Sequence, residues 1–231
     1  MSSTELQIVR KSATLRLLVE DKLRSAIATG RFKPGQRLIE RELCELTGVG
    51  RTSIREALRQ LEAEGLVTTI PHRGPSVSTI SLDEARQLYS VRALLEGHAG
   101  REFARRRVPE DLRDLGLAVK HFVQAAKSDD RAELIKAKTE FYSALMRGGG
   151  NMFVEQMLTT MHNRITLLRL TSMTSKGRLK NSVAEIKAIH DAIREGDPDR
   201  AEASCVKHIE EAAKVALRVL ASTEADATVD A

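Results

Sequence analysis

The sequence predicts a mainly α-helical protein, in which a small N-terminal domain with two short strands precedes an all-α helical bundle. Three observations support this fold class. Only 3% of the 231 residues are aromatic and none is tryptophan, a composition that favours helices packed through aliphatic side chains. Two β-branched runs lie close together between residues 66 and 80. Every later segment has apolar residues at helical spacing.

The first 80 residues contain the signals of three helices and a hairpin. We expect helices over 13–29, within IERELCELTGVG and over Thr52–Glu64, each followed by a glycine. Leu66–Ile70 and Ser76–Ile80 are the predicted strands, joined by PHRGP. The apolar face of the third helix comprises Ile54, Ala57, Leu58 and Leu61. This order of elements predicts a winged helix-turn-helix with a two-stranded wing, a DNA-binding domain over residues 1–80.

A new helix begins after the hairpin. Ser81 and Glu84 have the spacing of a capping box, so this helix starts near residue 82. We expect helices near 82–107, 110–127, 130–147, 152–172, 179–195 and 198–221, separated by glycine, proline and aspartate. The second domain therefore covers residues 81–222, and 223–231 is expected to be a flexible tail.

Charge is distributed unevenly along the chain. Residues 1–80 contain 13 lysines and arginines against 9 aspartates and glutamates, whereas residues 81–231 contain 24 against 23. This asymmetry fits a module that faces phosphates, joined to a neutral one. Cys44 and Cys205 have neither metal-ligand nor disulfide spacing, so we expect buried thiols in a reducing compartment. Because no segment is long and apolar enough to span a bilayer, we expect a cytoplasmic protein without a membrane partner.

The segment from Phe32 to Val77, FKPGQRLIERELCELTGVGRTSIREALRQLEAEGLVTTIPHRGPSV, closely resembles the winged helix-turn-helix of the GntR family of bacterial regulators. With the helical region that follows, the chain resembles the FadR branch, whose effector-binding and dimerisation domain is called FCD. The resemblance implies a homodimer that binds a palindromic operator in double-stranded DNA and responds to a small molecule. We expect a repressor of a catabolic or transport operon, with no enzymatic activity and no cofactor.

Candidate DNA contacts lie at the start of the third helix and on the wing. Arg51, Thr52, Ser53 and Arg55 occupy the end of the helix where backbone N–H groups point outward, and arginine can bind guanine O6 and N7. The resemblance adds Arg41, and a wing tip that enters the minor groove, formed by His72, Arg73 and Gly74. The alternative is a solvated helix face, on which Arg51, Arg55 and Arg59 pair with Glu56, Glu62 and Glu64.

Many FCD domains hold a divalent metal with one aspartate and three histidines. By resemblance, those four positions are here Lys138, Tyr142, Ile186 and His208, of which only His208 matches. A lysine ammonium and an isoleucine cannot act as ligands, so we expect no metal at this place. A rearranged metal site that uses His190 and His208 stays open. We interpret His98, His121 and His162 as surface or packing histidines.

Polar side chains instead interrupt apolar helix faces in the second domain. Arg92, Lys138, Tyr142 and His208 each lie on such a face, and we expect them to converge inside the bundle as an effector site. Buried cations without acids are costly, which favours either an internal partner or an anionic ligand, such as a carboxylate, that neutralises them. The alternative is structural: Arg92 pairs with Glu96, Lys138 extends to solvent and His208 is a hydrogen-bonded core histidine.

Other function classes are less consistent with the sequence. A metabolite-binding helical protein or an enzyme without operator binding would need a phosphate loop, paired carboxylates or an activated nucleophile, and we find none of these patterns. A constitutive architectural DNA-binding protein would bind DNA without responding to any small molecule. The effector and the operator sequence do not follow from the residues.

Overall fold

The computed structural model describes residues 11–128, 130–173 and 177–229. The chain divides into two compact units, Met1–Thr79 and Ile80–Ala231. The first unit contains α1 (Lys11–Ala28), α2 (Glu40–Thr47), α3 (Arg51–Ala63), β1 (Val67–Ile70) and β2 (Gly74–Val77). Helices α1 and α2 both pack against α3. The predicted apolar face of α3 is buried, and this confirms that its periodicity marks the core of the unit.

The wing differs from its predicted form in the position of the second strand. This strand covers Gly74–Val77 rather than residues 76–80, and Ile70 lies opposite Gly74 in the antiparallel pair. His72 and Gly74 adopt positive φ values of 64° and 80°, so the chain reverses within the few residues between the strands. The residues assigned to the loop, Gly74 and Pro75, therefore belong to the strand. An isolated bridge to Arg37 covers the other side of β2 at Ser76.

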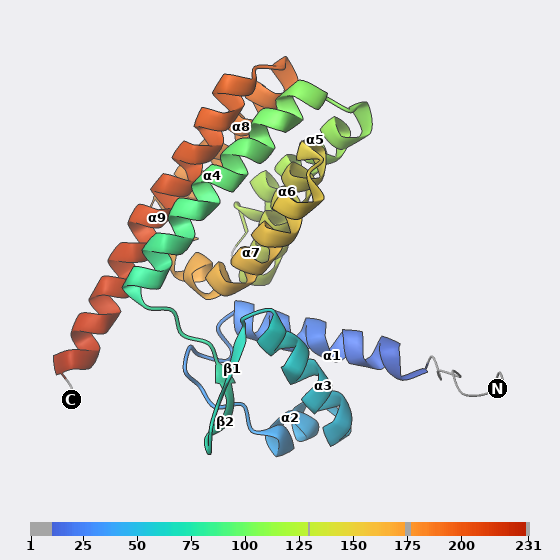
Figure 1. The fold of residues 1–231 in the computed structure, drawn as a ribbon, viewed down its shortest axis with the longest axis vertical. Coiled ribbons are helices and arrows are strands. Elements are labelled where there is room, and N and C mark those ends of the chain that lie inside the picture. Colours follow the sequence, from blue (N-terminus) through green and yellow to red (C-terminus); the bar gives the residue numbers. More distant parts are fainter. Residues whose placement is uncertain (1–10, 129, 174–176, 230–231) are drawn as a thin grey trace. The chain divides into compact units, whose positions relative to one another are not determined.

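The second unit is a bundle of helices (Figure 1). Its elements are α4 (Leu82–Arg106), α5 (Pro109–Ala125), α6 (Arg131–Gly149), α7 (Met152–Met173), α8 (Arg178–Glu195) and α9 (Pro198–Val229). The capping box is confirmed, because the Ser81 side chain accepts a hydrogen bond from Glu84 N and the Glu84 side chain accepts one from Ser81 N. None of the helices in the described ranges has both the length and the apolar composition of a membrane span.

Two helix ends lie later than the sequence predicted. Helix α6 includes Gly148 and Gly149, and it ends at Gly150 in a left-handed conformation. Gly148 is not a break, because it provides the space into which the ring of Phe103 packs. Helix α9 continues to Val229, beyond its predicted end near residue 221. Residues 230 and 231 lie outside the described part.

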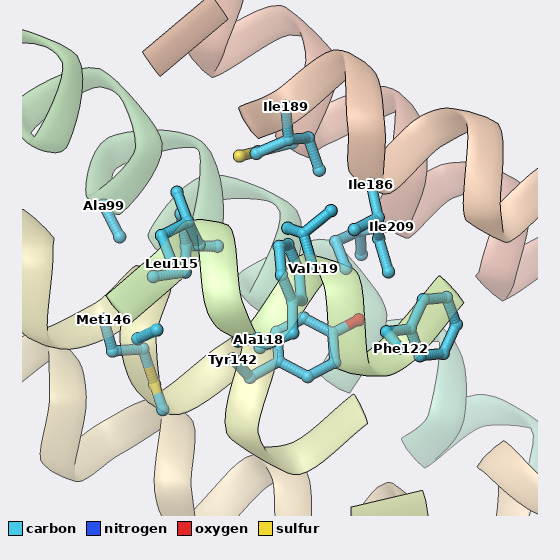
Figure 2. Packing of buried hydrophobic residues seen from close by; sticks show 14 of the residues in the cluster. Ala99, Leu115, Ala118, Val119, Phe122, Tyr142, Met146, Ile186, Ile189 and Ile209 are labelled. Atoms are coloured by element: carbon cyan, nitrogen blue, oxygen red, sulfur yellow. The ribbon is translucent and has the colours of Figure 1, made fainter. Parts of the chain in front are cut away.

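Helices α4 and α9 lie side by side and run in opposite directions (Figure 1). Their close approach depends on glycine: a Cβ atom at Gly100 would lie 2.6 Å from Cys205 Sγ. Figure 2 shows part of the core of this unit, with Val119 and Phe122 from α5, Tyr142 from α6 and Ile186 from α8. Cys205 is buried as expected, whereas Cys44 in the first unit is only half-buried. The bundle thus packs aliphatic and aromatic side chains around the few polar groups described next.

Candidate functional site

The start of α3 presents exposed polar side chains and an uncapped helix terminus. Arg51 and Thr52 are exposed and Ser53 is half-buried. Gly50 precedes them in an extended conformation, and no side chain caps the first turn. The first N–H groups of α3 are therefore available to an acceptor such as a phosphate oxygen. We call Arg51, Thr52, Ser53 and Arg55 the recognition segment.

Arg55 lies one turn further along α3 and contacts α2. Its Nε donates to both carboxylate oxygens of Glu40, at 2.8 and 2.9 Å. These hydrogen bonds and the Glu40 charge raise the pKa of Arg55. The alternative pairing of Arg55 along its own helix is thus not observed. Two of the glutamates expected in it have other partners: Glu62 accepts from Thr69 N, and Glu64 accepts from Arg24.

The remaining candidate DNA contacts are also at the surface of the first unit. The Arg41 side chain is 73% exposed and lies 3.9 Å from Glu45, a loose pair at helical spacing. His72 and Arg73 are exposed at the turn of the wing, and Gly74 is half-buried. These positions leave Arg41, His72 and Arg73 accessible to a nucleic acid.

The four candidate effector residues converge within the second unit. Arg92 on α4, Lys138 and Tyr142 on α6, and His208 on α9 are each at most 4% exposed. The Lys138 Nζ lies 3.0 Å and the Tyr142 hydroxyl 3.2 Å from His208 Nε2. The guanidinium of Arg92 lies 5.5 Å from the centre of the Tyr142 ring. Lys138 is buried, so the alternative in which it extends to solvent is wrong.

Glu96 supplies an acid beside Arg92. Arg92 Nε and Nη2 donate to one Glu96 oxygen at 2.8 and 2.6 Å, and His162 Nε2 lies 2.9 Å from the same oxygen. Burial alone would raise the pKa of Glu96, but Arg92 and His162 outweigh it and lower this pKa to about 2. Burial opposes the charge of Arg92 as well, yet Glu96 holds the pKa of Arg92 above its ordinary value. Arg92 therefore has an internal acidic partner, the pairing that the structural alternative predicts.

Helix α8 contributes a second acid. Glu185 accepts two hydrogen bonds from Arg178, at 3.0 and 2.9 Å, and it also contacts His208 Nδ1. Lys138 Nζ donates to Ser182 Oγ at 3.0 Å. Burial, and then the charges of Lys138 and Arg178, lower the pKa of His208 well below its usual value. Because the ammonium is only a donor, His208 Nε2 accepts and its proton lies on Nδ1, facing Glu185.

These side chains form two hydrogen-bonded groups that meet at the Tyr142 ring, whose centre lies 4.4 Å from that of the His162 ring, and we call them together the polar cluster. It contains Arg92, Glu96, Lys138, Tyr142, His162, Arg178, Ser182, Glu185 and His208. Among the lysines, arginines and carboxylates named, three carry positive and two carry negative formal charge. Sequence reasoning missed Arg178, Ser182 and Glu185, and interpreted His162 as a surface or packing histidine. Ser182 and Glu185 are three residues apart, and this spacing was the available signal that they share a face of α8.

The residues at the positions of the family's metal site do not fit a divalent cation. The ammonium of Lys138 lies within hydrogen-bonding distance of the only imidazole among them, and Ile186 is fully buried without a donor atom. His190 has a different environment from His208, since it lies against Gly116 of α5 and beside Asp191. Within the described ranges, no three histidine, cysteine, aspartate or glutamate residues are grouped as metal ligands.

Two surface hollows lie away from the polar cluster. One, of about 370 Å³, is lined by residues of α1, α2 and the turn between them, including Leu18, Phe32 and Leu43. The other, of about 430 Å³, lies between α5 and α6, beside His121 and Arg147. Neither is lined by a residue of the polar cluster.

Comparison with known proteins identifies both units. Residues 15–77 match the family model of "Bacterial regulatory proteins, gntR family", and residues 87–211 match that of the FCD domain. A relative from Paenarthrobacter nicotinovorans is 28% identical over 212 residues, which cover 90% of this chain and 91% of the relative. It is described as a probable D-xylose utilization operon transcriptional repressor. The galactonate operon transcriptional repressor of Escherichia coli (strain K12) is 27% identical, over 79% of this chain and 88% of its own length.

A solved structure supports the same fold. E. coli McbR/YncC aligns with a TM-score of 0.77 and 21% identity, over 88% of this chain and 97% of its own. The alignment extends across most of the elements described above. At this identity the match supports the architecture alone.

Proposed function

We propose that this chain, which belongs to the GntR family of bacterial regulatory proteins and contains an FCD domain, represses a catabolic or transport operon. Its family membership makes it a transcription regulator. In this proposal a homodimer binds a palindromic operator through the recognition segment, Arg41 and the wing residues His72, Arg73 and Gly74. A small anionic metabolite binds in the polar cluster and modulates operator affinity.

The exposed start of α3 carries the DNA-binding part of the proposal. Uncapped N–H groups suit a phosphate, and the side chains of Arg51 and Arg55 suit the acceptor edge of guanine. One such domain covers only a few base pairs, so specificity requires two copies on an inverted repeat.

A gel shift with the DNA upstream of the chain's own gene tests this part. We expect binding that competitor DNA of unrelated sequence does not abolish, and about a tenfold or greater loss of affinity in Arg51→Ala or Arg55→Ala. Wild-type affinity in both variants would show that the recognition segment does not read the operator. Equal affinity for operator and unrelated DNA would favour the alternative of a metabolite-binding protein or enzyme.

The excess positive charge of the polar cluster supports the proposal that an anionic effector binds there. Three cations face two carboxylates, and Lys138 and Tyr142 offer donors to one imidazole. An anion, such as a carboxylate, would neutralise the excess positive charge and replace His208 as the acceptor for these donors. Arg92 lies on α4, which begins five residues after the last wing residue, Val77, and so connects the cluster along the chain to the DNA-binding unit.

A panel of small carboxylates, assayed by thermal shift and then by gel shift, tests the effector part. A carboxylate at a hundred times its Kd adds about 2.7 kcal/mol of stability. We expect Lys138→Met to lose the effect of that carboxylate on the gel shift while it keeps operator binding, since α3 belongs to the other unit. A normal response of this variant would exclude the polar cluster as the effector site. A DNA complex that no carboxylate alters would favour constitutive DNA binding.

A further inference from the structure

The contact between Glu40 and Arg55 links the two helices of the DNA-binding motif. Glu40 is the first residue of α2, where a carboxylate is stabilised by the helix dipole. Its side chain is 29% exposed, against 60% for Arg55. Since α2 packs against α3, Glu40 is the fixed end of this pair and the guanidinium is its exposed end.

The geometry of the contact determines which donors of Arg55 remain. Both hydrogen bonds to Glu40 originate from Nε. The terminal nitrogens, Nη1 and Nη2, are still a planar pair of donors with a fixed separation. Guanine presents O6 and N7 side by side in the major groove, and such a donor pair can bind both acceptors together.

We propose that Glu40 is a positioning residue for base readout: it orients Arg55 so that Nη1 and Nη2 bind one guanine of the operator. The inference rests on the proposed operator binding. It makes a counterintuitive prediction, because a carboxylate close to DNA repels the phosphates. Loss of Glu40 should therefore strengthen binding to unrelated DNA while it weakens the preference for guanine at one position.

In vitro selection from a library of random DNA duplexes provides the test, with the full chain as wild type, Arg55→Ala, Glu40→Ala and Glu40→Gln. Arg55→Ala identifies the position at which Arg55 reads guanine. We expect Glu40→Ala to lower the guanine preference at that same position by about two- to tenfold, because an unrestrained arginine side chain must be ordered on binding. Glu40→Gln keeps an oxygen that accepts from Nε, so it should restore most of the preference.

Glu42→Ala is the matched control. Glu42 is also exposed in the first turn of α2, so this variant removes the same charge but leaves the Arg55 contact in place. We expect stronger binding to unrelated DNA without a change at the guanine position. Circular dichroism melts of each variant separate these effects from a loss of fold.

The possible failures are distinguishable. If the wild type selects no motif, the proposed operator binding itself fails. If the wild type selects a motif and Arg55→Ala leaves every position unchanged, Arg55 reads no base and the inference is overturned. The same holds if Glu40→Ala keeps the wild-type preference at the Arg55 position, or if Glu42→Ala loses it to the same extent.

Discussion

Arg92 and Glu96 are a fully buried ion pair one helical turn apart on α4. Each charge depends on the other, because neither is compensated by water. We expect Arg92→Met to lower the free energy of unfolding by about 3–5 kcal/mol, since Glu96 then stays buried and, among the described residues, keeps a hydrogen bond to His162 alone. Urea denaturation measures this change.

Two further variants test the origin of that loss. The double variant Arg92→Met/Glu96→Leu removes both charges, and it should be markedly more stable than Arg92→Met alone. Lys214→Met breaks an exposed pair with Glu211 and should leave the stability unchanged within error. If the double variant is as unstable as the single one, packing rather than charge explains the loss.

His208 makes stability depend on pH. Its pKa is well below the value of about 6.5 that it regains on unfolding, mainly because it is buried and then because Lys138 and Arg178 are close. A base with a lowered pKa binds its proton preferentially in the unfolded state. It therefore contributes stability above about pH 6.5, and this contribution is lost as the pH falls below that value.

The free energy of unfolding should thus decrease between pH 7.5 and 5.5 in the wild type, with a smaller slope in His208→Gln. Measuring above pH 5 avoids the titration of Glu96, whose stabilising contribution is lost as the pH falls from about 4.5 toward its folded pKa of about 2. His121 has a raised pKa, held by Glu140 and Glu133, and acts in the opposite direction in both proteins. Equal slopes in the two proteins would contradict a neutral, buried His208.

At the level of single side chains, the sequence identified four of the nine residues of the polar cluster as site residues, for a physical reason. Lys138 and His208 interrupt apolar stripes, and a polar group on such a stripe must be buried with its helix. Ser182 and Glu185 lie on α8, on the face that also buries Ile186 and Ile189. Which face of α8 meets α6 and α9 is a tertiary property, and no local pattern reports it.

Among the elements, boundaries were predictable where the stop signal is a local hydrogen bond. The capping box at Ser81 and the glycine after α2 act through neighbouring backbone atoms, so their meaning is independent of the rest of the fold. Gly148 is the same residue type but has a tertiary role, because it makes room for the Phe103 ring inside α6 and does not end the helix. The start of β2 also depended on one unusual residue, because a histidine in the left-handed region gives no reliable signal in the sequence.

Helix packing at Gly148 gives a prediction at the level of elements. A Cβ atom there would lie 2.2 Å from the Phe103 ring, so Gly148→Ala should lower the free energy of unfolding by about 1–3 kcal/mol. Gly116→Ala is the control, because its nearest neighbour, His190, lies at an ordinary contact distance of 3.5 Å. This variant should gain up to about 1 kcal/mol from helix propensity. Thermal and urea unfolding measure the change in the free energy of unfolding of both variants, which should be negative for Gly148→Ala and positive for Gly116→Ala. A stabilised Gly148→Ala would contradict the close packing of α4 on α6.

For the molecule as a whole, the proposed recognition of a palindromic operator predicts a homodimer. We expect light scattering to give twice the chain mass of 25.5 kDa for the free protein, and two chains per duplex on an inverted repeat. Changing the spacing between the half-sites by half a helical turn should abolish the cooperative complex, because the two recognition helices then face different sides of the DNA. A single chain bound at saturation to one half-site would contradict the dimer.

Chelators should also leave the thermal stability of the protein unchanged. The positions of the family's metal ligands hold Lys138, Tyr142 and Ile186, and one imidazole cannot retain a divalent cation against water. We expect the same Tm with and without EDTA, and no stoichiometric zinc, nickel or manganese in elemental analysis. About one metal ion per chain, together with a lowered Tm after chelation, would show that other donors form a site.

Because the positive charge beside His208 belongs to Lys138, all copies of this protein in a cell have the same charge at this place. A metal ion must be acquired after synthesis, and the fraction of chains that hold it follows the free ion concentration. A lysine side chain is made together with the chain, so every copy has its positive charge at this place from the moment it folds. Competition among metalloproteins, starvation and chelating metabolites leave that charge unchanged. The positive charge beside His208 is therefore the same in every growth condition.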